Sequence, residues 1–361
     1  MSQIIIEAAI VGMCALVIAM MLIPLIVKYS DKLGLMDKPN HRKVHAKPIP
    51  VIGGISIVIS VGLSLLLSKT ALQLLVKFPV LLSGSVLLFI IGVWDDRKNV
   101  RPIYRLALQL LCASAIAASG IRLTSMYGLF GMDELTIFWQ YTITILIITG
   151  VTNAFNLMDG IDGLAGGIAF INLLILATLS WMLDQHEVFI LLIAISGALI
   201  AFLKNNIHPA RIFMGDGGSL MLGFLMSSIG ILLIESGKSS SAINISYVVL
   251  IVSTILVIPV FDSLRVYAGR IKRGESPFKA DKTHLHHLFL ILGLNHKRAA
   301  FFIYGLEIVI LSLGFVLHQF VTISLSIVVI VALFLFVCQL LLLNSGVEKW
   351  TKIIRKMENS N

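Results

Sequence analysis

The amino-acid sequence predicts an all-α polytopic membrane protein with about 11 transmembrane helices, its N-terminus outside and its C-terminus in the cytoplasm. Of the 361 residues, 58% are hydrophobic and only 13% are charged, whereas about 25% of residues are charged in a typical soluble protein. Apolar runs long enough to cross a bilayer recur along the chain. Because backbone amides in hydrocarbon must be paired within their own segment, each run is expected to be a helix.

Eleven apolar runs supply these expected helices. They lie near residues 4–27, 51–68, 78–94, 103–120, 135–155, 164–183, 188–203, 218–234, 243–261, 301–318 and 321–343. The first run is longer than a signal-peptide core and its basic residues follow it, which places the N-terminus outside. The loops are too short for a soluble domain, so we expect a single transmembrane domain over 1–343 and a basic cytoplasmic tail over 344–361.

The basic residues sort unequally between the two sides of the membrane. Alternating spans put 24 of the 28 Lys and Arg residues on one side and leave four on the other. Lys and Arg concentrate in cytoplasmic loops, so the richer side is predicted to be cytoplasmic. The net charge of +9 then reflects topology and attraction to anionic lipid. Nucleic-acid binding is not expected, because no basic patch is interleaved with aromatic residues.

Five aspartates lie in three short polar motifs, all on the predicted cytoplasmic side. The motifs occupy residues 94–97, 153–163 and 213–219. A carboxylate near hydrocarbon costs free energy, so such a cluster indicates a functional site. Carboxylates with few lysines beside them suggest a bound Mg²⁺, and Mg²⁺ suggests phosphate chemistry.

The first motif carries Asp95 and Asp96 at the cytoplasmic end of an expected helix. The helix macrodipole is negative there, so a pair of carboxylates indicates a cation nearby. The simpler alternative is a solvated helix end with Arg97 and Lys98 as partners.

The second motif places a polar residue at every third position. Its members are Asn153, Asn156, Asp159 and Asp162. Residues three apart are neighbours on a helix surface, although the stripe drifts by about 60° per step. The alternative is an Asn/Asp/Gly turn, which rarely needs four polar side chains at constant spacing.

The third motif sets Asp216 among glycines just before a span. Glycines let a ligand approach the backbone, and the helix N-terminus that follows favours phosphate. The alternative for Asp216 is a helix N-cap. Phe213 is suited to stacking on a flat ring, although aromatic residues are also ordinary at a membrane interface.

Two further groups of side chains are candidates for binding anions. For the histidines we favour contact with phosphate, with a zinc site or a structural role as alternatives; they are His284, His286 and His287. The second group is read as an anion clamp, with ordinary positive-inside charge as its alternative; it consists of Arg42, Lys43 and His45.

Taken together and in order, these motifs resemble those of the polyprenyl-phosphate N-acetylhexosamine-1-phosphate transferases. The matching segments are DKPNHRKVHAKPIPVIGG, WDDR, NAFNLMDGIDGL, FMGDGGS and HLHH, and they cover the whole chain. The muramoyl-pentapeptide branch usually has three consecutive histidines, and here Leu285 interrupts them. The interrupted pattern resembles the branch that uses UDP-GlcNAc or a related UDP-HexNAc. The stretch Asn206-Ile-His208-Pro-Ala, however, resembles the muramoyl branch, so both donors remain open.

The resemblance implies an enzyme that moves N-acetylhexosamine-1-phosphate, GlcNAc-1-phosphate in the favoured version, from a UDP-sugar to undecaprenyl phosphate and releases UMP. This would be the first membrane step of a cell-surface polysaccharide such as O-antigen or teichoic acid. It implies a multi-pass protein of the bacterial inner membrane whose active site faces the cytoplasm, with Mg²⁺ or Mn²⁺ as cofactor. A homodimer is compatible with it. The alternative within the family is a phospho-N-acetylmuramoyl-pentapeptide transferase.

By the same resemblance, Asp216 is the metal ligand, while Asp95 and Asp96 meet the acceptor phosphate or the metal, one of them as a base. Asn156, Asp159 and Asp162 would hold the uridine end, with Phe213 stacking on uracil and Asn206 close by. Asp159 and Asp162 are also catalytic candidates, and Asn153 is a further candidate for binding substrate. The three histidines would hold the donor phosphates or the sugar.

Two other classes of function compete with this interpretation. A transporter of nucleotide sugar or lipid would need polar residues along a path at mid-membrane, whereas here they crowd one side. A metal-dependent hydrolase of lipid pyrophosphate would share the Asp and His residues, but would release inorganic phosphate and need no uridine site.

Overall fold

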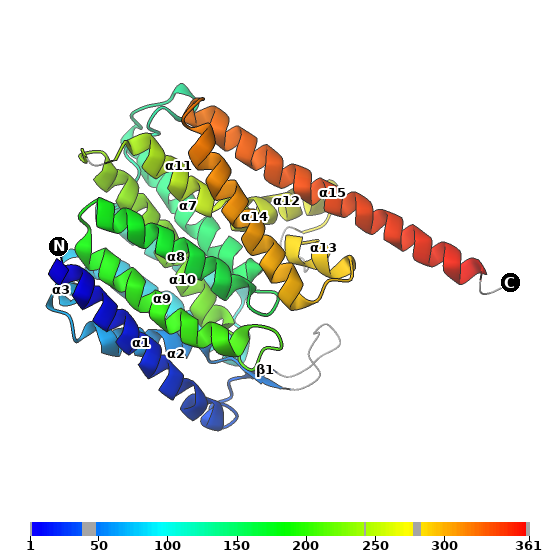
Figure 1. The fold of residues 1–361 in the computed structure, drawn as a ribbon, viewed down its shortest axis with the longest axis horizontal. Helices are drawn as coiled ribbons and strands as arrows, with labels where there is room; N and C mark the ends of the chain where they lie inside the picture. The colour runs from blue at the N-terminus through cyan, green and yellow to red at the C-terminus, as the bar shows by residue number, and fades with distance from the viewer. Residues whose placement is uncertain (1, 38–47, 242, 277–282, 359–361) are drawn as a thin grey trace.

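The protein is a bundle of membrane-spanning helices (Figure 1). The computed structural model describes residues 2–37, 48–241, 243–276 and 283–358. Within these residues, eight helices are long and apolar enough to cross a membrane, or up to ten if each of two bent pairs is one span. The expectation of an all-α polytopic membrane protein is confirmed, while the count of eleven and the orientation remain predictions.

The helices follow the expected apolar runs closely. In chain order they are α1 (Ser2–Tyr29), α2 (Gly53–Leu65), α3 (Lys69–Leu72), α4 (Leu74–Lys77), α5 (Pro79–Lys98), α6 (Pro102–Ala118), η1 (Leu129–Gly131), α7 (Ile137–Met158), α8 (Leu164–Met182), α9 (His186–Asn206), α10 (Gly215–Gly237), α11 (Ile245–Ile255), α12 (Val257–Lys272), α13 (Leu285–Ile291), α14 (His296–Leu317) and α15 (Ile323–Glu358). A small antiparallel hairpin pairs β1 (Met36–Asp37) with β2 (Ile49–Pro50). The tail from residue 344 continues α15 without a break, and α15 extends beyond the other helices (Figure 1).

The segment 243–261, expected to be one span, is broken at Leu256 into α11 and α12, which are bent by 54°. Pro259 explains the break, because proline has no N–H to donate to the carbonyl four residues earlier and its ring clashes with that carbonyl. The carbonyl concerned is that of Ile255, and it accepts a hydrogen bond of 2.9 Å from Nδ2 of Asn172 on α8 instead. A side chain of a neighbouring helix therefore satisfies the backbone group that the break exposes.

Helix α10 lies at the centre of the bundle. The whole of its 18-residue apolar window is buried, and it packs against α2, α5, α7, α8 and α11. A helix that is apolar all round is suited to such a central position. The start of α10, which carries Asp216, is thereby fixed relative to several helices at once.

Glycines allow α2 and α5 to reach the backbone of α10. A Cβ atom on Gly54 of α2 would lie 2.5 Å from the amide nitrogen of Gly218. A Cβ atom on Gly92 of α5 would overlap the backbone of Asp216 and Gly217. Small residues of this kind permit the close backbone contact on which helix packing in membranes depends. The contact at Gly92 brings the ends of α5 and α10, and hence two aspartate motifs, to the same place.

We expect Gly92→Ala to destabilise the protein by about 1–3 kcal/mol, the usual cost of adding a methyl group to a closely packed contact. Thermal unfolding in detergent micelles measures the effect. Gly62→Ala is the matched control, because Gly62 is also in a helix, α2, but a Cβ atom there would have no neighbour within 4 Å. An equal melting temperature for both variants would contradict the close approach of α5 to α10.

Candidate functional site

A cavity of about 720 Å³ opens where the loops after α5, α7 and α9 meet the start of α14. It receives side chains from all three aspartate motifs and from the histidine motif. The expected site residues that line it are Asp95, Asp96, Asp159, Asp162, Asn206, Phe213, Asp216 and His287. The structure thus brings together groups that are up to 192 positions apart in the chain.

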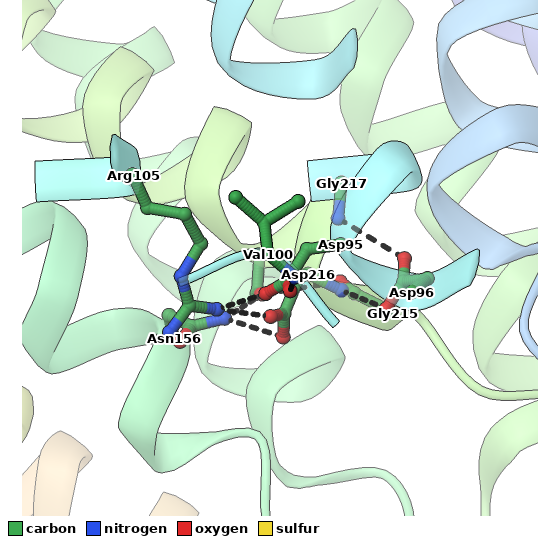
Figure 2. A network of polar contacts seen from close by, with 9 residues as sticks. Asp95, Asp96, Val100, Arg105, Asn156, Gly215, Asp216 and Gly217 are labelled. Carbon is green, nitrogen blue, oxygen red and sulfur yellow. Dashed lines mark hydrogen bonds and ion pairs between the residues drawn. The ribbon is translucent and has the colours of Figure 1, made fainter. Parts of the chain in front are cut away.

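The centre of the site is an ion-paired network around Asp216 (Figure 2). The guanidinium of Arg105, on α6, pairs with the carboxylates of both Asp95 and Asp216. On its other oxygen Asp216 accepts a hydrogen bond of 2.9 Å from Nδ2 of Asn156, which also donates to Oγ of Ser219 at 2.8 Å. Asp95 in turn accepts from the amide of Val100 at 2.6 Å. These contacts hold the two carboxylates side by side.

Asp96 points the opposite way and caps α10. Its Oδ1 accepts a hydrogen bond of 2.9 Å from the amide of Asp216, and its Oδ2 accepts one of 3.4 Å from the amide of Gly217. A carboxylate is favourable at a helix N-terminus, where backbone donors are unpaired. The capping role considered for Asp216 therefore belongs to Asp96. The side chain of Asp216 is directed toward Arg105 and Asn156 instead (Figure 2).

Asp159 and Asp162 lie in the turn between α7 and α8, yet their environments differ. Burial, followed by the charges of Asp216 and Asp162, raises the pKa of Asp159 to about 7. Burial alone would also raise the pKa of Asp162, but hydrogen bonds from His296, His208 and the amide of Ala210 outweigh it and hold that pKa at about 2. Asp159 can therefore exchange a proton near neutral pH, whereas Asp162 stays ionised.

The partners of Asp162 are two histidines that the sequence analysis did not assign to the site. Nδ1 of His208 lies 2.7 Å from Oδ2 of Asp162, and Nδ1 of His296 lies 3.3 Å from Oδ1. The ligand atoms of these three residues all lie within 4.8 Å of one another. Two imidazoles and a carboxylate would suit a transition metal. However, both imidazoles already face the carboxylate at hydrogen-bonding range, so we interpret the group as a structural contact that joins the α7–α8 turn, the α9–α10 loop and the start of α14.

The carboxylates of Asp95 and Asp216 are better suited to Mg²⁺, which prefers oxygen ligands. Arg105 lies between them, and its position shows that the pair needs a positive charge for balance. Asp159 lines the same cavity, and a cation near it would favour its ionised form. The donor set therefore fits the ion that the resemblance implies.

Two asparagines of the expected site have structural partners. Asn206 is buried; its Oδ1 accepts from the amide of Gly163 at 2.9 Å and its Nδ2 donates to the carbonyl of Ile212 at 2.9 Å. It lines the cavity while tying the α7–α8 turn to the α9–α10 loop. Asn153 is not among the lining residues, and its Nδ2 donates to Oε1 of Gln109 on α6 at 2.5 Å. The drift of about 60° per three residues carries Asn153 away from the face of Asn156.

Phe213 is held at the cavity by backbone pairing with the segment after the hairpin. Its amide donates to the carbonyl of Pro50 at 2.8 Å, and its carbonyl accepts from the amide of Gly53 at 2.9 Å. The loop before α10 is thus fixed to the start of α2. The anion clamp expected at Arg42, Lys43 and His45 lies outside the described residues.

The three histidines of the HLHH motif occupy three different environments. Only His287 lines the cavity. His286 is buried against Gly160, where a Cβ atom would overlap the ring, and burial lowers its pKa to about 3, so it is neutral at physiological pH. His284 is buried and its Nδ1 lies 2.9 Å from Oδ2 of Asp262 on α12. The expectation that all three line one phosphate site is therefore not matched by their positions.

Sequence reasoning missed Arg105, His208, His296 and Asp262. Arg105 is one of the basic residues on the predicted cytoplasmic side, and nothing in the sequence indicates which arginine of that side turns toward the site. His208 lies between two recognised site residues, Asn206 and Asp216, and that position was a usable signal. His296 and Asp262 depend on helix packing, which the sequence alone does not reveal.

We expect Asp162→Asn to lower the free energy of unfolding by about 2 kcal/mol at pH 7, the value of a pKa depressed from 3.8 to about 2. A depressed pKa stabilises the fold above the unfolded value, and the benefit is lost as the pH falls toward 2. The difference in melting temperature from the wild type should therefore narrow below pH 4. Asp184→Asn, at a carboxylate that is 81% exposed, is the control. An undiminished difference at pH 3 would contradict the assignment.

Known proteins resemble this chain in the same region. Residues 78–234 match the model of Glycosyl transferase family 4. The chain is 30% identical over 353 residues to the probable undecaprenyl-phosphate N-acetylglucosaminyl 1-phosphate transferase of Bacillus subtilis, covering 96% of each. It is 32% identical over 278 residues to the undecaprenyl-phosphate alpha-N-acetylglucosaminyl 1-phosphate transferase of Yersinia pestis, covering 75% of this chain and 74% of that one. A decaprenyl-phosphate N-acetylglucosaminephosphotransferase of Mycolicibacterium smegmatis is 28% identical over 323 residues, covering 82% and 79%. The chain therefore belongs to the polyprenyl-phosphate N-acetylhexosamine-1-phosphate transferases of glycosyl transferase family 4.

Proposed function

We propose that this protein transfers N-acetylglucosamine-1-phosphate from UDP-GlcNAc to undecaprenyl phosphate and releases UMP. The observation that carries the proposal is the convergence of Asp95, Asp159 and Asp216, from three separate motifs, on one cavity. Relatives that match most of the chain bear the names of GlcNAc-1-phosphate transferases acting on polyprenyl phosphates. The product would start a cell-surface polysaccharide such as O-antigen or teichoic acid.

The chemistry requires two anions to approach each other. An oxygen of the acceptor phosphate attacks the β-phosphorus of the donor, and the bond to the UMP oxygen breaks. Mg²⁺ or Mn²⁺ would neutralise the diphosphate charge in this step. Asp216 and Asp95 would hold the ion, and Arg105, which pairs with both, would be freed to face the phosphates. Positioning and charge balance are the protein's main contributions.

Asp159 has the properties of a proton acceptor for the attacking phosphate. Its carboxylate lines the cavity, and burial raises its pKa to about 7. Both oxygens of Asp96 already accept hydrogen bonds at the start of α10. Asp95 is paired with Arg105 and Val100, and Asp96 caps α10, whereas Asp159 has no such contact among those described above, so we propose Asp159 as the base.

The location of the site suits one soluble and one lipid substrate. The cavity lies among loops that the charge distribution assigns to the cytoplasm, in a chain of membrane helices. A cytosolic nucleotide sugar and a membrane-anchored acceptor can meet only at such an interface. We infer that the protein resides in the inner membrane of a bacterium, with this cavity open to the cytoplasm.

The muramoyl-pentapeptide donor is the less favoured alternative. The relatives that match most of the chain are named for N-acetylglucosamine. Leu285 also separates the histidines in the pattern that resembles the branch using UDP-GlcNAc or a related UDP-HexNAc. A transporter is also less favoured, because the acidic and histidine residues of the cavity gather at one end of the helices rather than along a path.

Purified protein with Mg²⁺, undecaprenyl phosphate and UDP-GlcNAc should release UMP and form a lipid-linked diphosphate sugar. UDP-GalNAc and UDP-MurNAc-pentapeptide serve as competing donors, and we expect UDP-GlcNAc to give the highest kcat/KM. Release of inorganic phosphate in place of UMP would identify a hydrolase. No UMP from any of the three donors would overturn the proposed function.

Asp216→Asn should reduce the rate of UMP release by about 10²-fold or more, because it weakens both the cation site and the balance of charge in the transition state. The variant keeps a side chain of the same shape but loses the ion pair with Arg105, so its melting temperature is measured as well, and the loss of rate is expected at a temperature where the variant remains folded. Asp31→Asn, at an exposed aspartate after α1, is the control and should retain full activity. Near-normal turnover by Asp216→Asn would show that the metal ligand lies elsewhere.

A further inference from the structure

The first histidine of the HLHH motif faces a buried carboxylate rather than the cavity. Asp262, on α12, and His284 are each only 5% exposed. The carboxylate contacts His284 through Oδ2, at 2.9 Å, and accepts the amide hydrogen of Leu285 through Oδ1, at 3.0 Å. Asp262 thus grips two consecutive residues at the point where α13 begins.

Arg265 completes this anchor. Its Nη2 donates to Oδ1 of Asp262 at 2.6 Å and to the carbonyl of Thr283 at 2.6 Å. One carboxylate and one guanidinium on successive turns of α12 therefore hold three consecutive residues, Thr283, His284 and Leu285. Hydrogen bonds that involve charged groups are the strong ones in proteins, and burial shields this set from competition by water.

A series of ring contacts leads from the anchor to the cavity. The ring of His284 is parallel to that of His286, with centroids 5.9 Å apart, and the ring of His286 lies 4.3 Å from that of His287. His287 lines the cavity. His286 also rests on Gly160, the residue between the cavity-lining Asp159 and Ile161. A displacement of His284 would therefore also move His287 and the turn around Gly160.

We propose that Asp262 is a positioning residue for the transfer reaction. It acts through His284 to fix α13, and it thereby places His287 at the wall of the cavity, where His287 would meet the UDP-sugar donor. The inference rests on the proposed function and divides the histidine motif into an anchor, a spacer and a residue that faces substrate. Arg265 supports Asp262 from the same helix. Outer contacts of this kind orient the groups that meet substrate, and a displacement of about 1 Å costs on the order of 10²-fold in rate.

The test uses the full-length protein in micelles and the variants Asp262→Asn, His284→Ala and their combination. Asp262→Asn keeps the shape and one acceptor oxygen but loses the charge that holds His284. We expect its KM for UDP-GlcNAc to rise by roughly tenfold or more while the KM for undecaprenyl phosphate stays within about twofold. If Asp262 acts through His284, the double variant should be no worse than the poorer single variant.

Hydrogen exchange provides a readout that does not depend on activity. In Asp262→Asn, the amides of α13, residues 285–291, should exchange faster, while those of α10 keep their protection. Asp31→Asn is the matched control and should change neither. Unchanged protection of α13 would overturn the positioning role, as would losses that add in the double variant or an activity loss fully explained by a lower melting temperature. Absence of UMP release by the wild type would instead reject the proposed function and leave the exchange result to decide on Asp262.

Discussion

The structure depends on the contact of α5 and α2 with the first turn of α10. Glycines at 54 and 92 let backbone meet backbone there, and Asp96 caps the exposed amides of Asp216 and Gly217. Because this contact fixes both the end of the first aspartate motif and the start of the third, the packing of these helices also positions their carboxylates. A protein that must gather carboxylates at the edge of hydrocarbon gains from this arrangement, since the cost of their burial is offset by helix capping and ion pairing.

The balance of charge in the cavity explains the uneven behaviour of its carboxylates. Asp95 and Asp216 share Arg105, and Asp162 is held ionised by two histidines and a backbone amide. Asp159 has neither arrangement among the contacts described above, and burial leaves its pKa near 7. Each of these carboxylates thus has a different set of partners, and its electrostatic environment differs accordingly.

Much of the fold could be predicted because the length of an apolar run is a local property of the chain. The apolar runs correspond to helices, and the three aspartate motifs meet as expected. Asn153 was expected in the site, but it is not among the residues that line the cavity, and the drift of the stripe along the helix accounts for this. What the sequence could not show is which side chain a neighbouring helix supplies. Arg105, His296 and Asp262 gain their roles from packing between segments distant in the chain, and His284 is drawn out of the cavity by Asp262.

The proline at the break between α11 and α12 has an effect far from its own position. Pro259 lacks the N–H that would bond to the carbonyl of Ile255, and Asn172 donates to that carbonyl instead, so α12 continues at an angle of 54° to α11. Asp262 lies one turn after Pro259 on α12, so the bend determines where its carboxylate is placed. Because Ile255, Val257 and Pro259 are buried within the protein, helix packing fixes this bend, and the bend in turn sets the position of the imidazole that Asp262 holds.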